Sequence, residues 1–324
     1  MKLLVTGGAG YIGSATARLF LEAGHEVVVL DNLSMGHREA VPDGAAFVEA
    51  DLLDGAAVRK VFRTRRPEGV VHFAASSLVG ESMQDPGKYF RNNVGGAVNL
   101  MEAMREFGAR VIVFSSTAAT YGVPETMPIT EDMPTVPTNP YGESKLMIEK
   151  VLRWYDDIYG IRWVALRYFN ACGALEDCGE DHDPETHLIP LLLLTALGKR
   201  KMFTVLGDDY PTPDGTCVRD YIHIHDLARA HVLALDEGAR GAYNLGTTTG
   251  NSVKEVLEAA QNVIGRPIPH EIGARRPGDP PSLVADHARI TRELGWKPEC
   301  SNLDEIIRSA WAWHSSHPDG YATR

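Results

Sequence analysis

The sequence predicts an α/β protein in which a doubly wound parallel sheet carries a smaller α/β lobe. Short apolar runs alternate with amphipathic segments through the first half of the chain, and a glycine-rich turn follows the first run. Strands that are buried on both faces read as nearly continuous apolar runs, and their alternation with helices is typical of successive β-α-β units. Ligands of such sheets bind at the carboxyl ends of the strands, so the residues that end each run are the first candidates for a site.

The elements of the first half follow from this alternation. Five apolar runs of strand length occupy residues 3–6, 26–31, 47–51, 70–74 and 111–115. A helix is expected over 12–23 with Gly24 as its C-cap, because glycine readily adopts the left-handed conformation that ends a helix. Five prolines in 124–140 predict a loop over the sheet edge. A helix over 141–159 and a buried strand over 163–167 are expected next.

The second half predicts a separate lobe. From residue 169 the alternation weakens, and loops rich in Asp, Gly and Pro occupy 173–186 and 207–217, while 221–235 is expected to return to the sheet. The prediction is a Rossmann sheet domain over 1–168 and about 218–245, with a ligand-binding lobe over about 169–217 and 246–324. A chain of 324 residues is long enough for two unequal lobes.

Composition excludes several classes of protein. The net charge of −11 argues against a nucleic-acid binder or a polybasic membrane-surface protein, because both need clustered positive charge. No apolar run approaches the roughly 18 residues of a membrane span. The four cysteines form no CxxC pair, which favours reduced thiols and a cytoplasmic location: Cys172, Cys178, Cys217 and Cys300.

The glycine-rich turn predicts a dinucleotide site. The segment TGGAGYIG carries Gly7, Gly10 and Gly13, and a GxGxxG pattern begins one residue later in the same turn. Such glycines allow a tight turn and let the backbone approach a pyrophosphate at the N-terminus of the following helix. Asp31 ends the next run, where a carboxylate accepts the ribose hydroxyls and repels a 2′-phosphate. Because no arginine follows immediately, NAD is favoured over NADP, and Asp51 is a candidate for the adenine end.

A second set of residues predicts proton-transfer chemistry. Tyr141 and Lys145 are four residues apart on the predicted helix, which places them on one face. A phenol titrates near 10, and a neighbouring ammonium favours the phenolate. The lysine is also able to hydrogen-bond a nicotinamide ribose. The hydroxyls that end the fifth run, Ser115 to Thr117, are placed to bridge a substrate hydroxyl and the tyrosine oxygen.

These motifs resemble the extended short-chain dehydrogenase/reductases, and within them the UDP-glucose 4-epimerase family. The resemblance covers essentially the whole chain, through LDNLS, HFAA, VGES, NNV, SKLMIEK, LRYFN, DYPTPDGTCVRDYIHIHDLA, YNLG and RRPGDP, of which segment 209–226 is the most specific. It implies reversible 4-epimerisation of UDP-glucose and UDP-galactose through a transient 4-keto intermediate and enzyme-bound NADH. It also implies a homodimer, built on the helices over 86–107 and 141–159.

The resemblance implies roles for individual residues. Tyr141 is the acid/base, Lys145 its electrostatic partner and Thr117 the catalytic hydroxyl. The implied NAD contacts are Gly7, Gly10, Tyr11, Ile12, Gly13, Asp31, Asn32, Asp51, Leu52, Phe73, Ala74, Ala75, Asn93, Ser115, Tyr141, Lys145 and Tyr168. The implied UDP-sugar contacts are Thr117, Tyr141, Asn170, His187, Leu188, Arg219, Tyr221, Arg276, Asp279 and Leu283. Two residues depart from the pattern: Ser77 replaces a cofactor-contacting lysine of some members, and His187 replaces an asparagine near the sugar.

Rival functions on the same scaffold need other residues. Nucleotide-sugar dehydratases and decarboxylases require a carboxylate just after the catalytic hydroxyl, where this chain has Ala118 and Ala119. A noncatalytic NAD-sensing protein has no need for the hydroxyl, tyrosine and lysine together. Leu283 is intermediate between the bulky and the small residues that the family uses there. A UDP-N-acetylhexosamine 4-epimerase therefore stays open as an alternative.

Two histidine-containing segments are weighed as metal sites. Asp181, His182, Asp183 and His187 cluster in one loop, and His223 and His225 alternate as on one strand face, a pattern typical of ligands. The sequence of the loop does not predict a fixed arrangement of these side chains, and no step of the implied reaction needs a metal. No metal is therefore expected.

Overall fold

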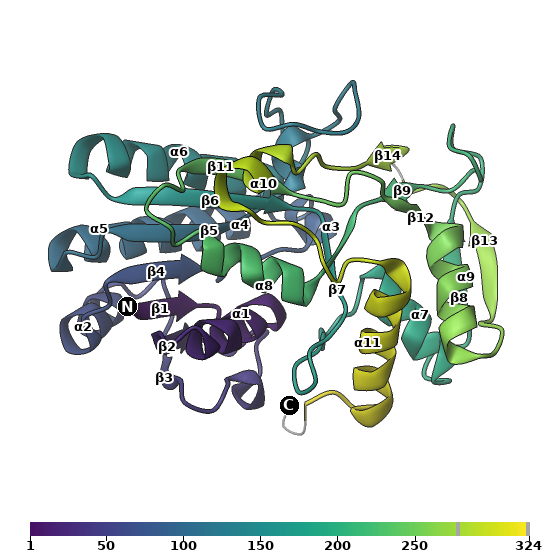
Figure 1. Ribbon diagram of the computed structural model, residues 1–324, viewed down its shortest axis with the longest axis horizontal. Helices are drawn as coiled ribbons and strands as arrows, with labels where there is room; N and C mark the ends of the chain where they lie inside the picture. Colours follow the sequence, from purple (N-terminus) through teal and green to yellow (C-terminus); the bar gives the residue numbers. More distant parts are fainter. Residues whose placement is uncertain (277–278, 322–324) are drawn as a thin grey trace.

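The computed structural model describes residues 1–276 and 279–321, and a sheet of seven parallel strands forms its centre (Figure 1). The strand order is β11-β6-β5-β4-β1-β2-β3, and every neighbouring pair is parallel. The chain runs outward from β1 to β3 and then crosses back to β4, so the order reverses between β1 and β4. Open α/β sheets bind their ligands at such a reversal. The predicted doubly wound parallel sheet is confirmed.

The strands lie close to the predicted apolar runs. They are β1 (Lys2–Thr6), β2 (Glu26–Asp31), β3 (Ala46–Glu49), β4 (Gly69–His72), β5 (Val111–Thr117), β6 (Arg162–Tyr168) and β11 (Gly241–Leu245). Strands β3 and β4 end two residues before the predicted runs, whereas β5 continues through Thr117. Strand β11 was not predicted, and it pairs with β6 at the sheet edge.

Two layers of helices bury the two faces of this sheet. They are α1 (Tyr11–Glu22), α8 (Ile224–Leu233) and α10 (Ala288–Leu294) on one face, and α2 (Gly55–Arg65), α5 (Gly96–Phe107) and α6 (Pro140–Tyr159) on the other. Successive strand residues point to opposite faces. Val5 and Val29 accordingly join the core under α1, while Leu4 and Val28 join the core under α2 and α5. The shorter helical segments are η1 (Arg38–Ala40), α3 (Val79–Ser82), α4 (Pro86–Tyr89), η2 (Phe90–Gly95) and η3 (Ala118–Tyr121).

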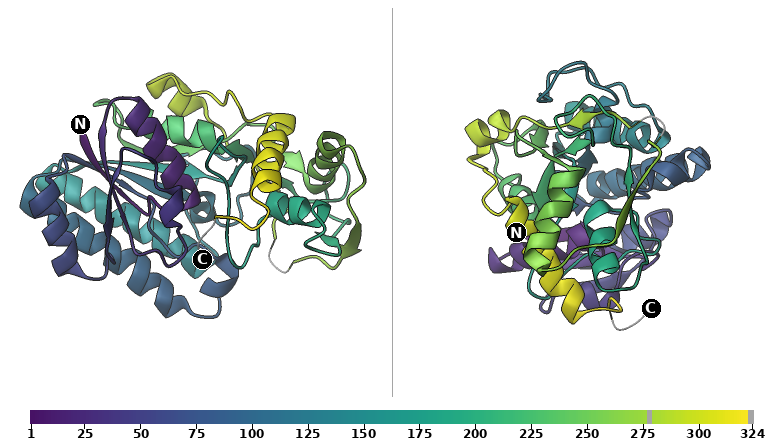
Figure 2. Two further views of the ribbon diagram at one scale, coloured as in Figure 1. Left: turned by 90° about the horizontal axis from the view of Figure 1, so that it is seen from below. Right: turned by 90° about the vertical axis from the view of Figure 1, so that its right-hand side faces the viewer.

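A second group of elements lies beside the sheet and has its own core (Figures 1 and 2). Its helices are α7 (Leu188–Ala196), α9 (Val253–Ile264) and α11 (Leu303–Ser316). Its strands are β7 (Asn170–Cys172), β8 (Phe203–Leu206), β9 (Val218–Arg219), β10 (Tyr221–His223), β12 (Asn251–Ser252), β13 (His270–Gly273) and β14 (Ser282–Leu283). Leu192, Phe203, Val256 and Ile306 pack in its centre.

The chain crosses between the two groups more than once. Helix α8 packs on α1, and α10 carries Ile290 into the core of the sheet together with Trp296. Residues 288–296 therefore lie with the sheet, although they fall within the range predicted for the lobe. Pro277 and Gly278 of the RRPGDP motif, and residues 322–324, lie outside the described residues.

The proline-rich segment 124–140 forms the predicted loop over the sheet edge. Its Ile129 N–H donates to the Val284 carbonyl (2.8 Å), and the Ile129 carbonyl accepts from Asp286 N–H (2.8 Å). The following helix α6 begins at Pro140, one residue before the predicted start, where the Asn139 side chain accepts the Gly142 N–H (2.8 Å). Within residues 1–276 and 279–321, no helix combines the length and the apolar character needed to cross a membrane.

Candidate active site

Two positions of the glycine turn after β1 leave no room for a side chain. Gly7 has φ of 73°, and a Cβ there would lie 2.5 Å from the Ala74 nitrogen. A Cβ on Gly13 would lie 2.1 Å from the Gly7 carbonyl oxygen. Helix α1 then begins at Tyr11, with Gly10 as an N-cap that offers no side-chain acceptor. The first N–H groups of a helix have no intrahelical partner, so this turn presents free backbone donors to an anion.

The ends of β2 and β3 carry the three polar residues expected at the adenosine side. Asp31 is 7% exposed, and its carboxylate accepts the N–H groups of Ala9 (3.0 Å) and Leu33 (2.9 Å). Burial raises the pKa of Asp31, and these backbone hydrogen bonds oppose the rise. Asn32 Nδ2 donates to Asp51 Oδ2 (3.0 Å). The carboxylate next to the glycine turn is therefore held in one position before any ligand binds.

The segment after β4 lies between the glycine turn and α6. The N–H groups of Phe73 and Ala74 both donate to the Thr6 carbonyl (2.9 and 3.1 Å). Asn93, 1% exposed, accepts the Ser76 N–H (2.8 Å) and donates to Ser144 Oγ (2.9 Å) on α6. The remaining predicted cofactor residues of this region are Leu52 and Ala75, which are buried and half-buried, while Ser77 is exposed.

The predicted catalytic residues meet at the carboxyl ends of β5 and β6. Lys145 is 3% exposed, donates from Nζ to the Ser115 carbonyl (2.8 Å), and lies 5.9 Å from the centre of the Tyr141 ring. Burial lowers the pKa of Lys145 to about 7. Burial raises the pKa of Tyr141, whereas a hydrogen bond with Thr117 lowers it. The Ser115 hydroxyl is hydrogen-bonded to that of Tyr168.

A buried polar network lies behind these residues, and the sequence analysis missed it. Glu149 accepts from Ser116 Oγ (2.6 Å) and from Arg167 Nε (3.0 Å), and the Arg167 guanidinium also donates to Tyr121 Oη (2.8 Å). Tyr121 in turn donates to Asn244 Oδ1 on β11 (2.7 Å). Two signals were available: Glu149 follows Lys145 by one helical turn, and Arg167 is a charge in an otherwise apolar strand, which needs a partner when buried.

The predicted substrate residues begin directly after the catalytic strands. Asn170 on β7 donates from its backbone N–H and its Nδ2 to the Asp220 carbonyl (3.1 and 2.8 Å). This ties β7 to β10, where Tyr221 is 3% exposed. His187 is the N-cap of α7, and Leu188 is its first residue.

Four predicted substrate residues lie together in the lobe. Arg219 and Leu283 are register partners on β9 and β14. Asp279 lies 3.5 Å from the Arg219 guanidinium and 4.0 Å from that of Arg276. Arg219 is largely buried, with 14% of its side chain exposed, whereas Arg276 is 61% exposed. The fold thus gathers two arginines at one place, as phosphate recognition requires.

His223 and Tyr11 each make a hydrogen bond that the sequence did not predict. His223 and His225 do not alternate on a strand, so that prediction is wrong: His223 ends β10, and its ring Nδ1 caps α8 by accepting the His225 N–H (3.0 Å). The Tyr11 hydroxyl donates to the Gly173 carbonyl (2.6 Å). Because this bond occupies the Tyr11 hydroxyl, the predicted dinucleotide contact of Tyr11 rests on its backbone at the start of α1, where Ile12 follows.

With this geometry in view, the chain's relatives define its class. Residues 3–246 match the model of the NAD dependent epimerase/dehydratase family, and the chain belongs to that family. Its relatives include the UDP-glucose 4-epimerase of Lacticaseibacillus casei, which is 53% identical over 330 residues and covers 100% of both chains.

Solved structures of similar proteins agree with this. The UDP-glucose 4-epimerase of Bifidobacterium longum in complex with NAD+ and UDP superposes with a TM-score of 0.94 at 39% identity, covering 99% of this chain and 100% of that one. The UDP-Glc/GlcNAc 4-epimerase of Campylobacter jejuni superposes with a TM-score of 0.86 at 44% identity, covering 97% of this chain and 99% of that one.

Proposed function

We propose that this chain is an NAD-dependent isomerase that interconverts UDP-glucose and UDP-galactose by inverting carbon 4 of the hexose. The observation that carries the proposal is the meeting of Thr117, Tyr141 and Lys145 at the carboxyl end of β5. The glycine turn and the fixed Asp31 carboxylate lie at the carboxyl ends of β1 and β2 in the same sheet. The full-length similarity to UDP-glucose 4-epimerases supports the same reaction.

In the proposed mechanism, Tyr141 removes the proton of the 4-hydroxyl, directly or through Thr117, and later returns it. The Lys145 ammonium stabilises the phenolate form of Tyr141. When bound, NAD would supply reversible hydride exchange with carbon 4. The glycine turn would hold its pyrophosphate and Asp31 its adenosine ribose. Between the two transfers the 4-keto sugar turns to present its other face.

The lobe would anchor the UDP while the sugar turns. Arg219 and Arg276 offer bidentate donors to the diphosphate and uridine end, and Asp279 lies between them. Asn170 and Tyr221 lie where the lobe joins the catalytic strands. We propose a division into a sheet domain, 1–168 and about 218–245, and a UDP-sugar lobe, about 169–217 and 246–324, except that residues 288–296 pack with the sheet.

Residues after Thr117 favour epimerisation over elimination. Ala118 and Ala119 follow it in η3, and neither side chain carries a proton. Dehydration at carbons 5 and 6, or decarboxylation, needs an acid or base beside the catalytic hydroxyl. These two positions therefore favour epimerisation at carbon 4 over dehydration or decarboxylation.

A second candidate substrate is the N-acetylated sugar nucleotide. Leu283, half-buried on β14, is smaller than a tyrosine and larger than the small residues associated with admitting an N-acetyl group. Turnover of UDP-galactose compared with UDP-N-acetylgalactosamine by the same preparation decides between the two. A preference for the N-acetylated sugar would reassign the substrate and leave the reaction type unchanged.

The decisive variant is Tyr141→Phe. We expect it to retain NAD and to lose most interconversion of UDP-glucose and UDP-galactose, because the proton acceptor is gone while the backbone contacts of the turn remain. Tyr155→Phe is the matched control: it makes the same change on α6, at a hydroxyl bonded to Glu102 (2.6 Å). Wild-type turnover by Tyr141→Phe would refute the assignment.

We further propose a cytoplasmic homodimer. Helix α6 presents Met147, Trp154 and Ile158 as exposed apolar side chains, the last two 64% and 62% exposed. Their spacing of seven and four residues places them on one stripe of the helix. Val98 on the neighbouring α5 is 36% exposed. Exposed apolar stripes of this kind mark association surfaces, and all four cysteines are free thiols, as expected in a reducing compartment.

A further inference from the structure

The loop between β7 and α7 brings two histidines and two glutamates to one point. The donor atoms of Glu180, His182, Glu185 and His187 all lie within 4.8 Å of one another. The sequence pointed to Asp181 and Asp183 beside the histidines and to a loop without fixed geometry. In the structure it is Glu180 and Glu185 whose carboxylates lie beside the two histidines.

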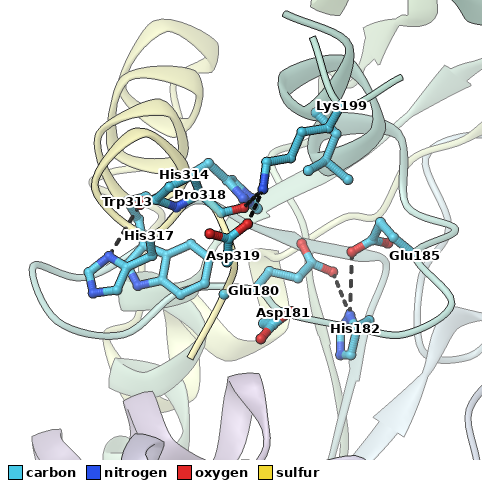
Figure 3. Close-up of a pocket in the computed structure, with 12 residues that line it drawn as sticks. Glu180, Asp181, His182, Glu185, Lys199, Trp313, His314, His317, Pro318 and Asp319 are labelled. Atoms are coloured by element: carbon cyan, nitrogen blue, oxygen red, sulfur yellow. Dashed lines mark hydrogen bonds and ion pairs between the residues drawn. The ribbon is translucent and has the colours of Figure 1, made fainter. Parts of the chain in front are cut away.

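Both imidazoles turn the same ring nitrogen toward the carboxylates. His182 Nδ1 lies 3.2 Å from a Glu180 oxygen and 3.8 Å from a Glu185 oxygen (Figure 3). His187 Nδ1 lies 2.8 Å from Glu180 and 2.9 Å from Glu185. The His182 Nδ1 atom is fully buried and has no partner in hydrogen-bond geometry among the described residues. Such a nitrogen is satisfied either by a charged contact with these carboxylates or by a ligand at the point where the four groups converge.

A second cluster in the chain differs from this one in the partners of a carboxylate. In the first cluster, Glu185 Oε1 accepts the N–H groups of Thr186 and His187 (2.6 Å each), a pattern that Glu180 does not share among the described residues. His225, Asp226 and Cys300 form a second group of the same kind. There one Asp226 oxygen accepts the N–H groups of Glu299 (3.0 Å) and Cys300 (2.8 Å) and a serine hydroxyl, so the fold itself uses that carboxylate. Glu180 is 5% exposed, and in the described part of the chain only the two imidazoles approach its carboxylate within ion-pair distance.

The charge and the donor types suit a divalent cation. With both imidazoles deprotonated, as metal binding requires, the two carboxylates give the site a charge of −2, and two nitrogen and two oxygen donors match the four-coordinate sites of zinc. A cavity of about 290 Å³ is lined by Glu180, His182 and Glu185 on one side and by α11 residues on the other (Figure 3). It gives an ion a path to the cluster.

We propose that Glu180, His182, Glu185 and His187 form a binding site for a divalent transition-metal ion, with zinc the ion that this donor set fits best. The ion fixes the loop that carries His187 and Leu188 to the start of α7. Its role is structural, and because His187 and Leu188 are also implied UDP-sugar contacts, metal content and stability rather than turnover are the readouts that test it. The competing arrangement is a pair of charged imidazolium–carboxylate contacts with no metal.

The test measures metal content and uptake in the full chain, produced without a polyhistidine tag and with its retained NAD. The protein is treated with a chelator, dialysed into metal-free buffer, and titrated with Zn²⁺ by calorimetry. Elemental analysis gives the stoichiometry. The variants are Glu180→Gln, which keeps the side-chain shape, and His187→Asn, which introduces a residue that related sequences carry there. His225→Ala, in the second group, is the matched control.

We expect the wild type and His225→Ala to bind about one zinc per chain. Glu180→Gln and His187→Asn should bind it at least about 10-fold more weakly, since even outer-shell changes cost that much. Zinc should raise the melting temperature of the wild type and leave those two variants unchanged. No zinc uptake by the wild type overturns the proposal. So does uptake by both folded variants with wild-type affinity, because the ion then binds elsewhere.

Discussion

Replacing Gly13 by alanine should release the bound dinucleotide while the chain stays folded. The new Cβ would lie 2.1 Å from the Gly7 oxygen and 2.9 Å from the Gly7 carbonyl carbon, where ordinary contact begins at 3.4 Å. The Cβ would therefore be about 1.3 Å too close to backbone atoms, so the turn itself must move by that order. A hydrogen bond to a charged group contributes about 1.5–3 kcal/mol, so each one lost weakens NAD binding about 10- to 100-fold.

The assay is the amount of NAD(H) that remains with the protein after desalting, followed by turnover with and without added NAD. The wild type should keep its cofactor and need none added, because the proposed reaction has no net redox change. Gly24→Ala is the control: its φ is +81° but a Cβ there meets nothing within 4 Å, so it adds backbone strain far from the turn. Wild-type NAD retention by Gly13→Ala would refute the steric argument.

Three further predictions concern the surroundings of the site. Lys145→Met should move the acidic limb of the pH–rate profile to higher pH, because the Tyr141 phenolate loses its cation. Lys145 Nζ lies 5.9 Å from the centre of the Tyr141 ring. With that distance as the charge separation and an effective dielectric constant of about 20, the attraction is about 3 kcal/mol, or about 2 pH units. An acidic limb that stays in place would contradict this account. Arg167→Met should cost about 3–5 kcal/mol of unfolding free energy by urea denaturation, because Glu149 is left buried without its partner; adding Glu149→Gln should restore part of it. Trp154→Glu should yield monomers in light scattering, and an unchanged dimer mass would exclude this helix face as the interface.

The sheet was predictable because its signal is local. Buried parallel strands are apolar along their whole length, so the apolar runs around Val5, Val29 and Val113 could be recognised as strands in the sequence. The end of each strand was less predictable. Strand β5 extends through the polar Ser116 and Thr117, because their backbones pair with β6 and the Ser116 hydroxyl is bonded to Glu149. Tertiary partners, not apolar character, keep those residues in the strand.

The lobe was less predictable, because its elements depend on contacts between distant segments. Strand β9 has two residues, and it exists through pairing with β12 and β14, more than thirty and sixty residues further along. The hydrophobic periodicity of the sequence does not predict pairing between such distant strands. The cluster in the loop before α7 was only partly predictable for the same reason. The sequence singled out Asp181 and Asp183 beside the histidines, and only the fold brings Glu180 and Glu185 to His182 and His187.

The two arginines of the lobe differ in a way that bears on the proposed reaction. Arg219 is held in a three-stranded sheet between Asn251 and Leu283, and 14% of its side chain is exposed. Arg276 is 61% exposed and lies 4.0 Å from its nearest carboxylate, that of Asp279. Ordering a free side chain on binding costs about 0.5–1.5 kcal/mol of binding free energy. Arg219 is already largely ordered in the folded chain, so most of this cost does not arise when a ligand binds to it. In the proposed reaction the UDP must stay in place while the hexose turns, and we therefore propose Arg219 as its fixed anchor and Arg276 as a contact that becomes ordered on binding.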